Sequence, residues 1–157
     1  MDATPQHPGV HYPPPLIYVV GFGVAWVLNR WRPLPITAGP SLARMIVTLV
    51  FFLAYLTLFV TAFTAFRRVS TTLIPNRPAT AFVTEGPYQF TRNPMYVSLF
   101  ALYIAVTSFA NTWWPLIILP LVLLVVDRAV IAREERYLGA AFPSEYAAYR
   151  ARVRRWL

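Results

Sequence analysis

The sequence contains no cysteine and no lysine, and only six of its 157 residues are acidic. Without cysteine, the chain forms neither a disulfide framework nor a thiolate metal site. It is also too apolar for a disordered protein, because 57% of its residues are hydrophobic. Its 14 arginines give a net charge of +8, which in a soluble protein would suggest a nucleic-acid partner. A mean hydropathy of +0.51 indicates a membrane protein instead.

Long apolar runs dominate the first half of the chain. A helix needs about 20 apolar residues to cross about 30 Å of hydrocarbon. Residues 42–66 meet this requirement, with Arg44 as their only charge, and predict a spanning helix. The run 16–28 is shorter, but it can span if it extends to Trp31 and Arg30 reaches the interface. It does not read as a signal peptide, because no basic residue precedes it and no small-x-small cleavage site follows it.

Gly21 and Gly23 lie inside this first apolar run. A G-x-G pattern without a preceding strand is a weak signal for a dinucleotide site. We therefore expect both glycines to allow close helix packing.

Two further apolar runs, 95–110 and 113–126, are separated only by Asn111-Thr112. So short a connection predicts an antiparallel helical hairpin. Pro115 suits the first turn of the second helix, whereas Pro120 should kink it. The sequence thus predicts an all-α integral membrane protein with about four transmembrane helices.

The C-terminal stretch carries a helical stripe that Pro143 interrupts, so one helix should end and another begin near Phe142. Its other face is rich in arginine and should lie on anionic lipid as amphipathic cytoplasmic helices. The stripe consists of Leu138, Phe142, Tyr146, Tyr149, Val153 and Trp156.

The arginine distribution predicts the orientation in the membrane. With four crossings, the N-terminus, the 67–93 loop and the C-terminal tail share one side, and that side holds 11 of the 14 arginines. The positive-inside rule places this side in the cytoplasm, in a bacterial inner membrane. We expect residues 1–15 to be a flexible proline-rich tail, in which His7 and His11 are not a metal site. Residues 16–157 should then form a single membrane domain.

Two polar clusters could carry chemistry. In the first, Gly86-Pro87 marks a turn, and Asn93-Pro94 starts a helix, with Asn93 as its cap. Free backbone N–H groups at such a helix start favour an anionic group.

The second cluster is the acid pair Glu134-Glu135, flanked by Arg133 and Arg136. Adjacent carboxylates point in different directions on a helix, so at most one of them should face a pocket. A carboxylate beside an apolar bundle needs a cationic partner or ligand. Together the clusters suit S-adenosylmethionine, which has a carboxylate, an ammonium, a ribose and a flat ring, although NADPH shares several of these groups.

The order and spacing of these motifs resemble those of the isoprenylcysteine carboxyl methyltransferase family, which includes small bacterial members and related phospholipid methyltransferases. The resemblance covers residues 73–157, the motif-bearing core. The matching residues are Val83-Thr84-Glu85-Gly86-Pro87-Tyr88, Arg92-Asn93-Pro94-Met95-Tyr96, Glu134-Glu135, Leu138, Phe142, Tyr146, Tyr149, Val153 and Arg155-Trp156.

The resemblance implies an S-adenosylmethionine-dependent methyltransferase with a cytosolic cofactor pocket and a lipophilic acceptor that arrives from the lipid. It implies no metal and no nucleic-acid partner. Arg92 and Glu134 would be catalytic, Arg92 by holding a carboxylate and Glu134 by anchoring the cofactor. Cofactor contacts would fall on Thr80, Ala81, Phe82, Val83, Tyr88, Asn93, Pro94, Met95, Tyr96, Glu134 and Glu135.

The chain departs from the family pattern at two positions. Eukaryotic members usually have histidine where this chain has Asn93, which can bind but cannot titrate. They also place a substrate-holding arginine where this chain has Val130, with Arg128 and Arg133 nearby on other faces. Two alternatives stay open: an NADPH-dependent, sterol-type membrane reductase, and a small four-helix transporter. A transporter needs an ionisable group deep inside a helix, and the sequence offers none.

Overall fold

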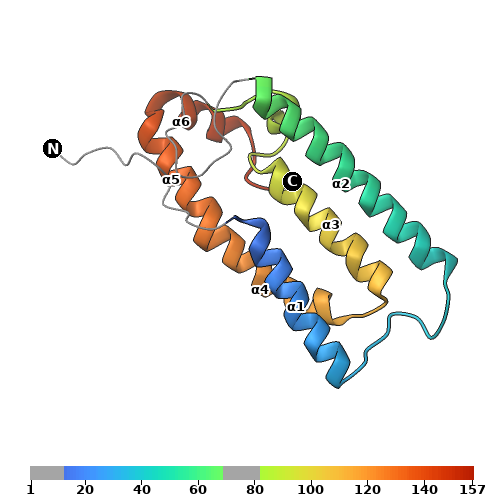
Figure 1. Cartoon of the computed structure of the whole chain (residues 1–157). Helices are drawn as coiled ribbons and strands as arrows, with labels where there is room; N and C mark the ends of the chain where they lie inside the picture. The colour runs from blue at the N-terminus through green and yellow to red at the C-terminus, as the bar shows by residue number, and fades with distance from the viewer. Residues whose placement is uncertain (1–12, 69–81) are drawn as a thin grey trace.

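The computed structural model describes residues 13–68 and 82–157, and this part of the chain is helical, without a strand. The long helices run alongside one another, and the last two lie at one end of them (Figure 1). This confirms the predicted all-α class. The elements are α1 (Pro15–Trp31), α2 (Leu42–Arg68), the 3-10 turn η1 (Gly86–Gln89), α3 (Pro94–Ala110), α4 (Trp114–Val126), the π-helical turn η2 (Asp127–Ile131), α5 (Ala132–Ala141) and α6 (Pro143–Arg152).

Within the described residues, two helices are long and apolar enough to cross a membrane: Leu42–Arg68 with 27 residues and Trp114–Ala141 with 28. The second consists of α4, η2 and α5 without a break. Helices α1 and α3 form where the sequence predicted them, with 17 residues each. Both are shorter than the roughly 20 residues that span a bilayer upright. That these two also cross the membrane therefore stays a prediction.

Prolines set the local boundaries of the helices. Pro94 and Pro115 lie in the first turns of α3 and α4, where a missing N–H costs no hydrogen bond. Pro143 begins α6 directly after α5 ends at Ala141, which confirms the predicted change of helix at Phe142. Pro120 lies inside α4, which continues past it.

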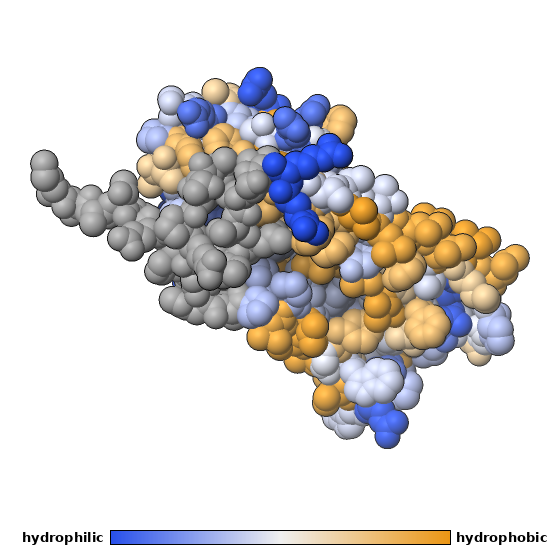
Figure 2. All heavy atoms as spheres, turned by 45° about the horizontal axis from the view of Figure 1, so that its top comes forward, coloured by the Kyte–Doolittle hydropathy of each residue, from blue (hydrophilic) through white to orange (hydrophobic). Residues whose placement is uncertain are grey.

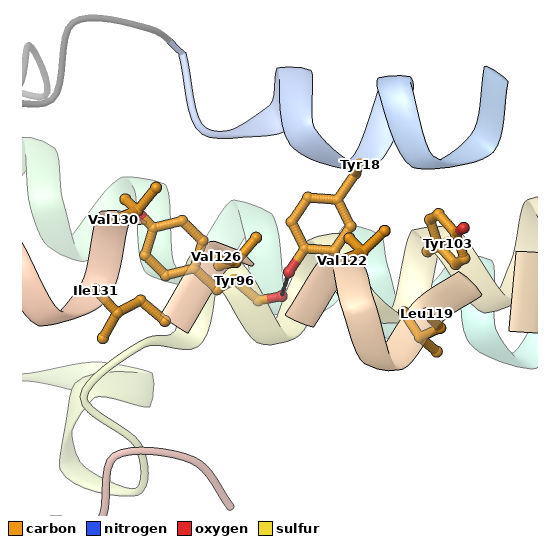
Figure 3. Packing of buried hydrophobic residues seen from close by; sticks show 8 residues of the cluster. All are labelled: Tyr18, Tyr96, Tyr103, Leu119, Val122, Val126, Val130 and Ile131. Atoms are coloured by element: carbon orange, nitrogen blue, oxygen red, sulfur yellow. Dashed lines mark hydrogen bonds between the residues drawn. The ribbon is translucent and has the colours of Figure 1, made fainter. Parts of the chain in front are cut away.

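The main apolar core joins α1, α3 and α4 (Figure 3). Tyr18 of α1 packs edge-on against Tyr103 of α3, and its hydroxyl donates to the carbonyl oxygen of Tyr96 at 3.4 Å. Helices α3 and α4 of the predicted hairpin contact each other, although α3 packs mainly on α2 and α4 mainly on α1. The fully buried residues of the core, Val126, Val130 and Ile131, belong to the end of α4 and to η2.

The outer surface of the bundle is largely apolar (Figure 2). Helix α2 contributes most to it, since only 6% of its most apolar window is buried in the molecule. Polar side chains gather over the end formed by α5 and α6 (Figure 2). An apolar flank with a polar end suits a helical bundle surrounded by lipid.

At the other end of the bundle, Arg44 caps helix α3. Its Nη1 donates to the carbonyl oxygens of Ser108 at 2.8 Å and Phe109 at 2.9 Å. These are carbonyls of the last turn of α3, which lack partners within the helix. Asn111 ends the helix in a left-handed conformation, with φ at 53°. The single charge in the apolar run of α2 thus has a structural partner.

Gly21 permits the contact between α1 and α4, whereas Gly23 does not take part in it. A Cβ added at Gly21 would lie 2.3 Å from Cγ2 of Val122, and one added at Gly23 would meet no atom within 4 Å. The packing explanation is therefore confirmed for Gly21 and wrong for Gly23.

We expect Gly21→Ala to lower stability by about 1–3 kcal/mol, because the buried Val122 must shift to admit the methyl group. Gly23→Ala is the matched control and should leave stability unchanged or slightly higher. Thermal unfolding in detergent, followed by circular dichroism, measures both. Equal melting temperatures for the two variants would contradict the close approach.

Candidate functional site

The polar end of the bundle brings together segments that are far apart in the sequence. The loop before α3, the first turn of α3, helices α5 and α6, and the residues after α6 all meet there. Most of the residues that the sequence singled out lie in these segments. Thr80 and Ala81 fall outside the described residues.

Tyr96 and Glu134 form the first contact of the site. The Tyr96 hydroxyl donates to Oε1 of Glu134 at 2.9 Å, which joins the first turn of α3 to α5. Tyr96 is 9% exposed and Glu134 is half-buried. The carboxylate thus lies between an apolar wall and the polar end, where a cationic ligand group would stabilise it.

Tyr88 lies close to this contact. Burial, followed by the neighbouring Tyr149 and Glu134, raises the pKa of Tyr88. Its phenol therefore stays neutral near pH 7 and does not act as a general base. The backbone carbonyl of Tyr88 accepts a hydrogen bond of 2.7 Å from the hydroxyl of Tyr149, which ties α6 to η1.

Glu135 points away from Glu134 and pairs with two arginines. Nη2 of Arg92 lies 3.2 Å from Oε1 of Glu135. The guanidinium of Arg155 grips both carboxylate oxygens, through Nε to Oε1 at 3.2 Å and through Nη2 to Oε2. Its third nitrogen, Nη1, reaches Oδ1 of Asp127 at 3.3 Å. The hydrogen bond to Glu135 raises the pKa of Arg155, which stays charged.

Two nitrogens of the Arg92 guanidinium make no hydrogen bond within the described residues. Its side chain is 9% exposed, and its Nε and Nη1 are buried without an acceptor in the part of the chain that the structure describes. A buried guanidinium with unused donors costs free energy unless an anionic group completes it. Arg92 can therefore bind a carboxylate or a phosphate group of a ligand.

Asn93 is the residue before α3, but its side chain does not cap the helix, so that part of the prediction is wrong. The amide Nδ2 donates to the carbonyl oxygen of Arg155 at 2.9 Å instead. The hydroxyl of Thr91 donates to the same carbonyl at 3.1 Å. The bond to the C-terminal segment fixes the orientation of the Asn93 side chain, and in that orientation it accepts no hydrogen bond from the helix N-terminus.

This C-terminal segment pairs with the loop along its backbone. Thr91 and Arg154 form a parallel bridge, and the backbone N–H of Arg92 donates to the Arg154 carbonyl at 2.9 Å. Sequence reasoning included Arg155 only as a motif residue and missed its role, along with that of Asp127. The scarcity of acids was the available signal, since Asp127 and Glu135 are two of only six.

Phe82 starts an aromatic cluster on α6. Its ring centroid lies 5.3 Å from that of Phe142 and 5.5 Å from that of Tyr149. Val83 and Tyr88 pack with Met95 and with Ala62 and Ala65 of α2. The predicted cofactor residues of the loop are thus held against α2 on one side and α6 on the other.

An open groove of about 740 Å³ runs between α5 and α6. Glu135 is the one predicted cofactor residue among those that line it. Its lining combines small side chains with charged and aromatic ones: Ala132, Glu135, Arg136, Gly139, Pro143, Tyr146, Ala147, Arg150, Ala151 and Arg155.

The position of the missing family arginine is closed to a ligand, because Val130 is fully buried in the core. Arg128 does not take the place of this arginine at the acid pair. Its side chain is 78% exposed, and its Nε lies 3.7 Å from Oδ2 of Asp127. Arg133 is exposed. The guanidinium groups beside Glu135 are those of Arg92 and Arg155.

Comparison with known proteins gives two matches. A family model described as phospholipid methyltransferase matches residues 43–145, a range that includes Arg92 and the acid pair. A protein of Haemophilus influenzae, described as uncharacterized, is 41% identical over 66 residues, which are 40% of this chain and 100% of that protein. No solved structure matches the chain.

We expect Asn93→Ala to destabilise the protein by about 1 kcal/mol, because the part-buried hydrogen bond from the Asn93 amide to the Arg155 carbonyl is lost. Gln89→Ala removes an exposed side-chain amide and should leave the melting temperature unchanged. Thermal unfolding in detergent compares the two variants. An unaltered melting temperature for Asn93→Ala would show that the hydrogen bond is dispensable.

Proposed function

Because the chain belongs to the phospholipid methyltransferase family, we propose that it transfers a methyl group from S-adenosylmethionine to a lipophilic acceptor in the membrane. Family membership supports an enzyme that transfers methyl groups. Cofactor and acceptor are our proposals, and they rest on the chemistry of the polar end of the bundle.

The observation that carries the proposal is that this end holds both a carboxylate, Glu134, and a guanidinium, Arg92, whose Nε and Nη1 have no acceptor within the described residues. Glu134 would bind the ammonium group of the cofactor, and the free Nε and Nη1 of Arg92 would bind its carboxylate. The amino-acid part of S-adenosylmethionine carries both charges on one carbon. The negative carboxylate of Glu134 and the positive guanidinium of Arg92 therefore match the two opposite charges of this group.

Other residues complete the proposed cofactor site. The hydroxyl of Tyr96 orients Glu134, and the ring of Tyr88 supplies an apolar surface for the adenine. Phe82, Val83, Pro94 and Met95 would enclose the cofactor between α2 and α6. Glu135 would act through Arg92, with which it pairs. The predicted contacts at Thr80 and Ala81 stay proposals without a structural description.

The proposed reaction is a direct displacement. The acceptor atom would bond to the methyl carbon as the bond from that carbon to sulfur breaks, and S-adenosylhomocysteine would leave with the electron pair. The sulfonium supplies the activation. The protein must hold donor and acceptor about 3–3.5 Å apart and exclude water. Tyr88 stays neutral and supplies no general base. We propose an acceptor that is already ionised or is a soft nucleophile.

The long helix Trp114–Ala141 suits an acceptor that arrives through lipid. At 1.5 Å per residue, about 20 residues cross the hydrocarbon, so Glu134 would emerge close to the interface. A lipid-soluble acceptor can reach that depth along the bundle while the cofactor approaches from water.

We further propose that this end faces the cytoplasm and that residues 16–157 form one membrane domain. The arginine excess on the 67–93 loop and the tail supports this orientation. No observation favours the NADPH-dependent reductase or the transporter. The family that matches is one of methyltransferases, and the described contacts of Arg92 and Glu134 do not point to NADPH rather than S-adenosylmethionine.

We expect Glu134→Gln to raise the dissociation constant for S-adenosylhomocysteine by about 10- to 100-fold, because a charged hydrogen bond to the ammonium group is lost. Calorimetry on the protein in detergent measures it. Glu145→Gln, which neutralises an exposed acid of α6, is the control and should bind normally. Undiminished binding by Glu134→Gln would exclude the assigned role, and transfer of labelled methyl from the cofactor to total membrane lipid tests the reaction itself.

The lack of native cysteine makes the orientation directly testable. Ser144→Cys, at the start of α6, should react with an impermeant maleimide only in inverted or opened vesicles. Ala38→Cys, in the connection between α1 and α2, should react in intact cells. Labelling of both from the same side would refute the proposed topology.

A further inference from the structure

Arg155 contacts the site without pointing its charge into it. Its guanidinium is occupied on three sides, by both oxygens of Glu135 and by Asp127. Nη1 and Nη2 each keep one further N–H group, and Arg155 lines the groove between α5 and α6. Its three side-chain contacts within the described residues all go to acids of the protein, so its effect on Arg92 passes through Glu135.

The geometry around Glu135 is unequal. Arg155 uses two parallel N–H groups on the two carboxylate oxygens, which is the strongest arrangement available to such a pair. Arg92 makes a single contact, from Nη2 to Oε1 at 3.2 Å. With both oxygens engaged by the Arg155 fork, Arg92 meets Glu135 through one nitrogen only. Its Nε and Nη1 are left buried and without an acceptor in the described ranges.

We propose that Arg155 is a positioning residue. By hydrogen bonding to both carboxylate oxygens of Glu135, it leaves Nε and Nη1 of Arg92 available to the ligand. This inference rests on the proposed function, in which Arg92 binds the carboxylate of the cofactor. Without the Arg155 guanidinium, Glu135 turns its free oxygen to Arg92 and forms a two-point pair with it. One of the two nitrogens that should bind the ligand is then consumed inside the protein.

The Arg155 side chain can be removed without releasing the segment that carries it. The hydrogen bonds from Thr91 and Asn93 go to the backbone carbonyl of Arg155, and Arg92 holds the carbonyl of Arg154. A substitution at Arg155 therefore leaves the backbone pairing in place. The exposed Arg152, at the end of α6, serves as the matched control.

The test compares two ligands that differ in the amino-acid part. S-adenosylhomocysteine has the carboxylate that Arg92 would bind, whereas methylthioadenosine keeps the adenosine and the sulfur and lacks it. By calorimetry in detergent, Arg155→Met should weaken S-adenosylhomocysteine by about 10- to 100-fold and leave methylthioadenosine unchanged. Arg155→Lys should recover only part of the loss, because an ammonium group cannot form the fork. Arg152→Met should bind both compounds like the wild type.

A second arm asks whether the effect passes through Arg92. In the Arg92→Met background, Arg155→Met should add no further loss of S-adenosylhomocysteine binding, since residues that act as one unit are not additive. Equal weakening of both ligands by Arg155→Met, or additive losses in the double variant, would overturn the positioning role. Normal binding by Arg155→Met would also overturn it while the proposed function stands. Failure of the wild-type protein to bind S-adenosylhomocysteine would overturn the proposed function and this inference together.

Discussion

The pairing of one carboxylate, Glu135, with two guanidinium groups holds the polar end of the bundle together. Arg92 comes from the loop before α3 and Arg155 from the segment after α6, while Glu135 lies on α5. Ion pairs of this kind add little net stability, but they are costly to break and so they specify an arrangement. The backbone bridge between Thr91 and Arg154 sets the register between the loop and the C-terminal segment, and the ion pairs join both segments to α5.

The two adjacent acids divide their tasks because a helix turns about 100° per residue. Glu134 faces α3, where Tyr96 is its hydrogen-bond partner, and Glu135 faces the arginines. The sequence already predicted that the pair would diverge and that at most one member would face a pocket. A chain with so few acids thus uses one carboxylate for its own architecture and keeps the other beside the proposed ligand.

The helices were predictable from the sequence because apolar runs and prolines are local signals. The predicted ends at Ala110 and around Phe142 agree with α3, α5 and α6. The partners were not predictable, because they depend on contacts between distant segments. Asn93 is of a residue type that commonly caps helices, yet its side-chain amide donates to the carbonyl oxygen of Arg155, more than sixty residues away. Likewise, no periodic pattern in the sequence predicts that α3 packs on α2 or that the turn η2 is π-helical.

The π-helical turn lies directly between the apolar part of the long helix and the acid pair, and the helix runs through it without a break. Since each residue added or removed there rotates everything beyond it by about 100°, the acids would lose their partners after a change of a single residue. Exchange of one aliphatic side chain for another along the lipid-facing side has no such effect. The span is therefore free to vary in composition but constrained in length, so homologues should tolerate substitutions in it far better than insertions or deletions.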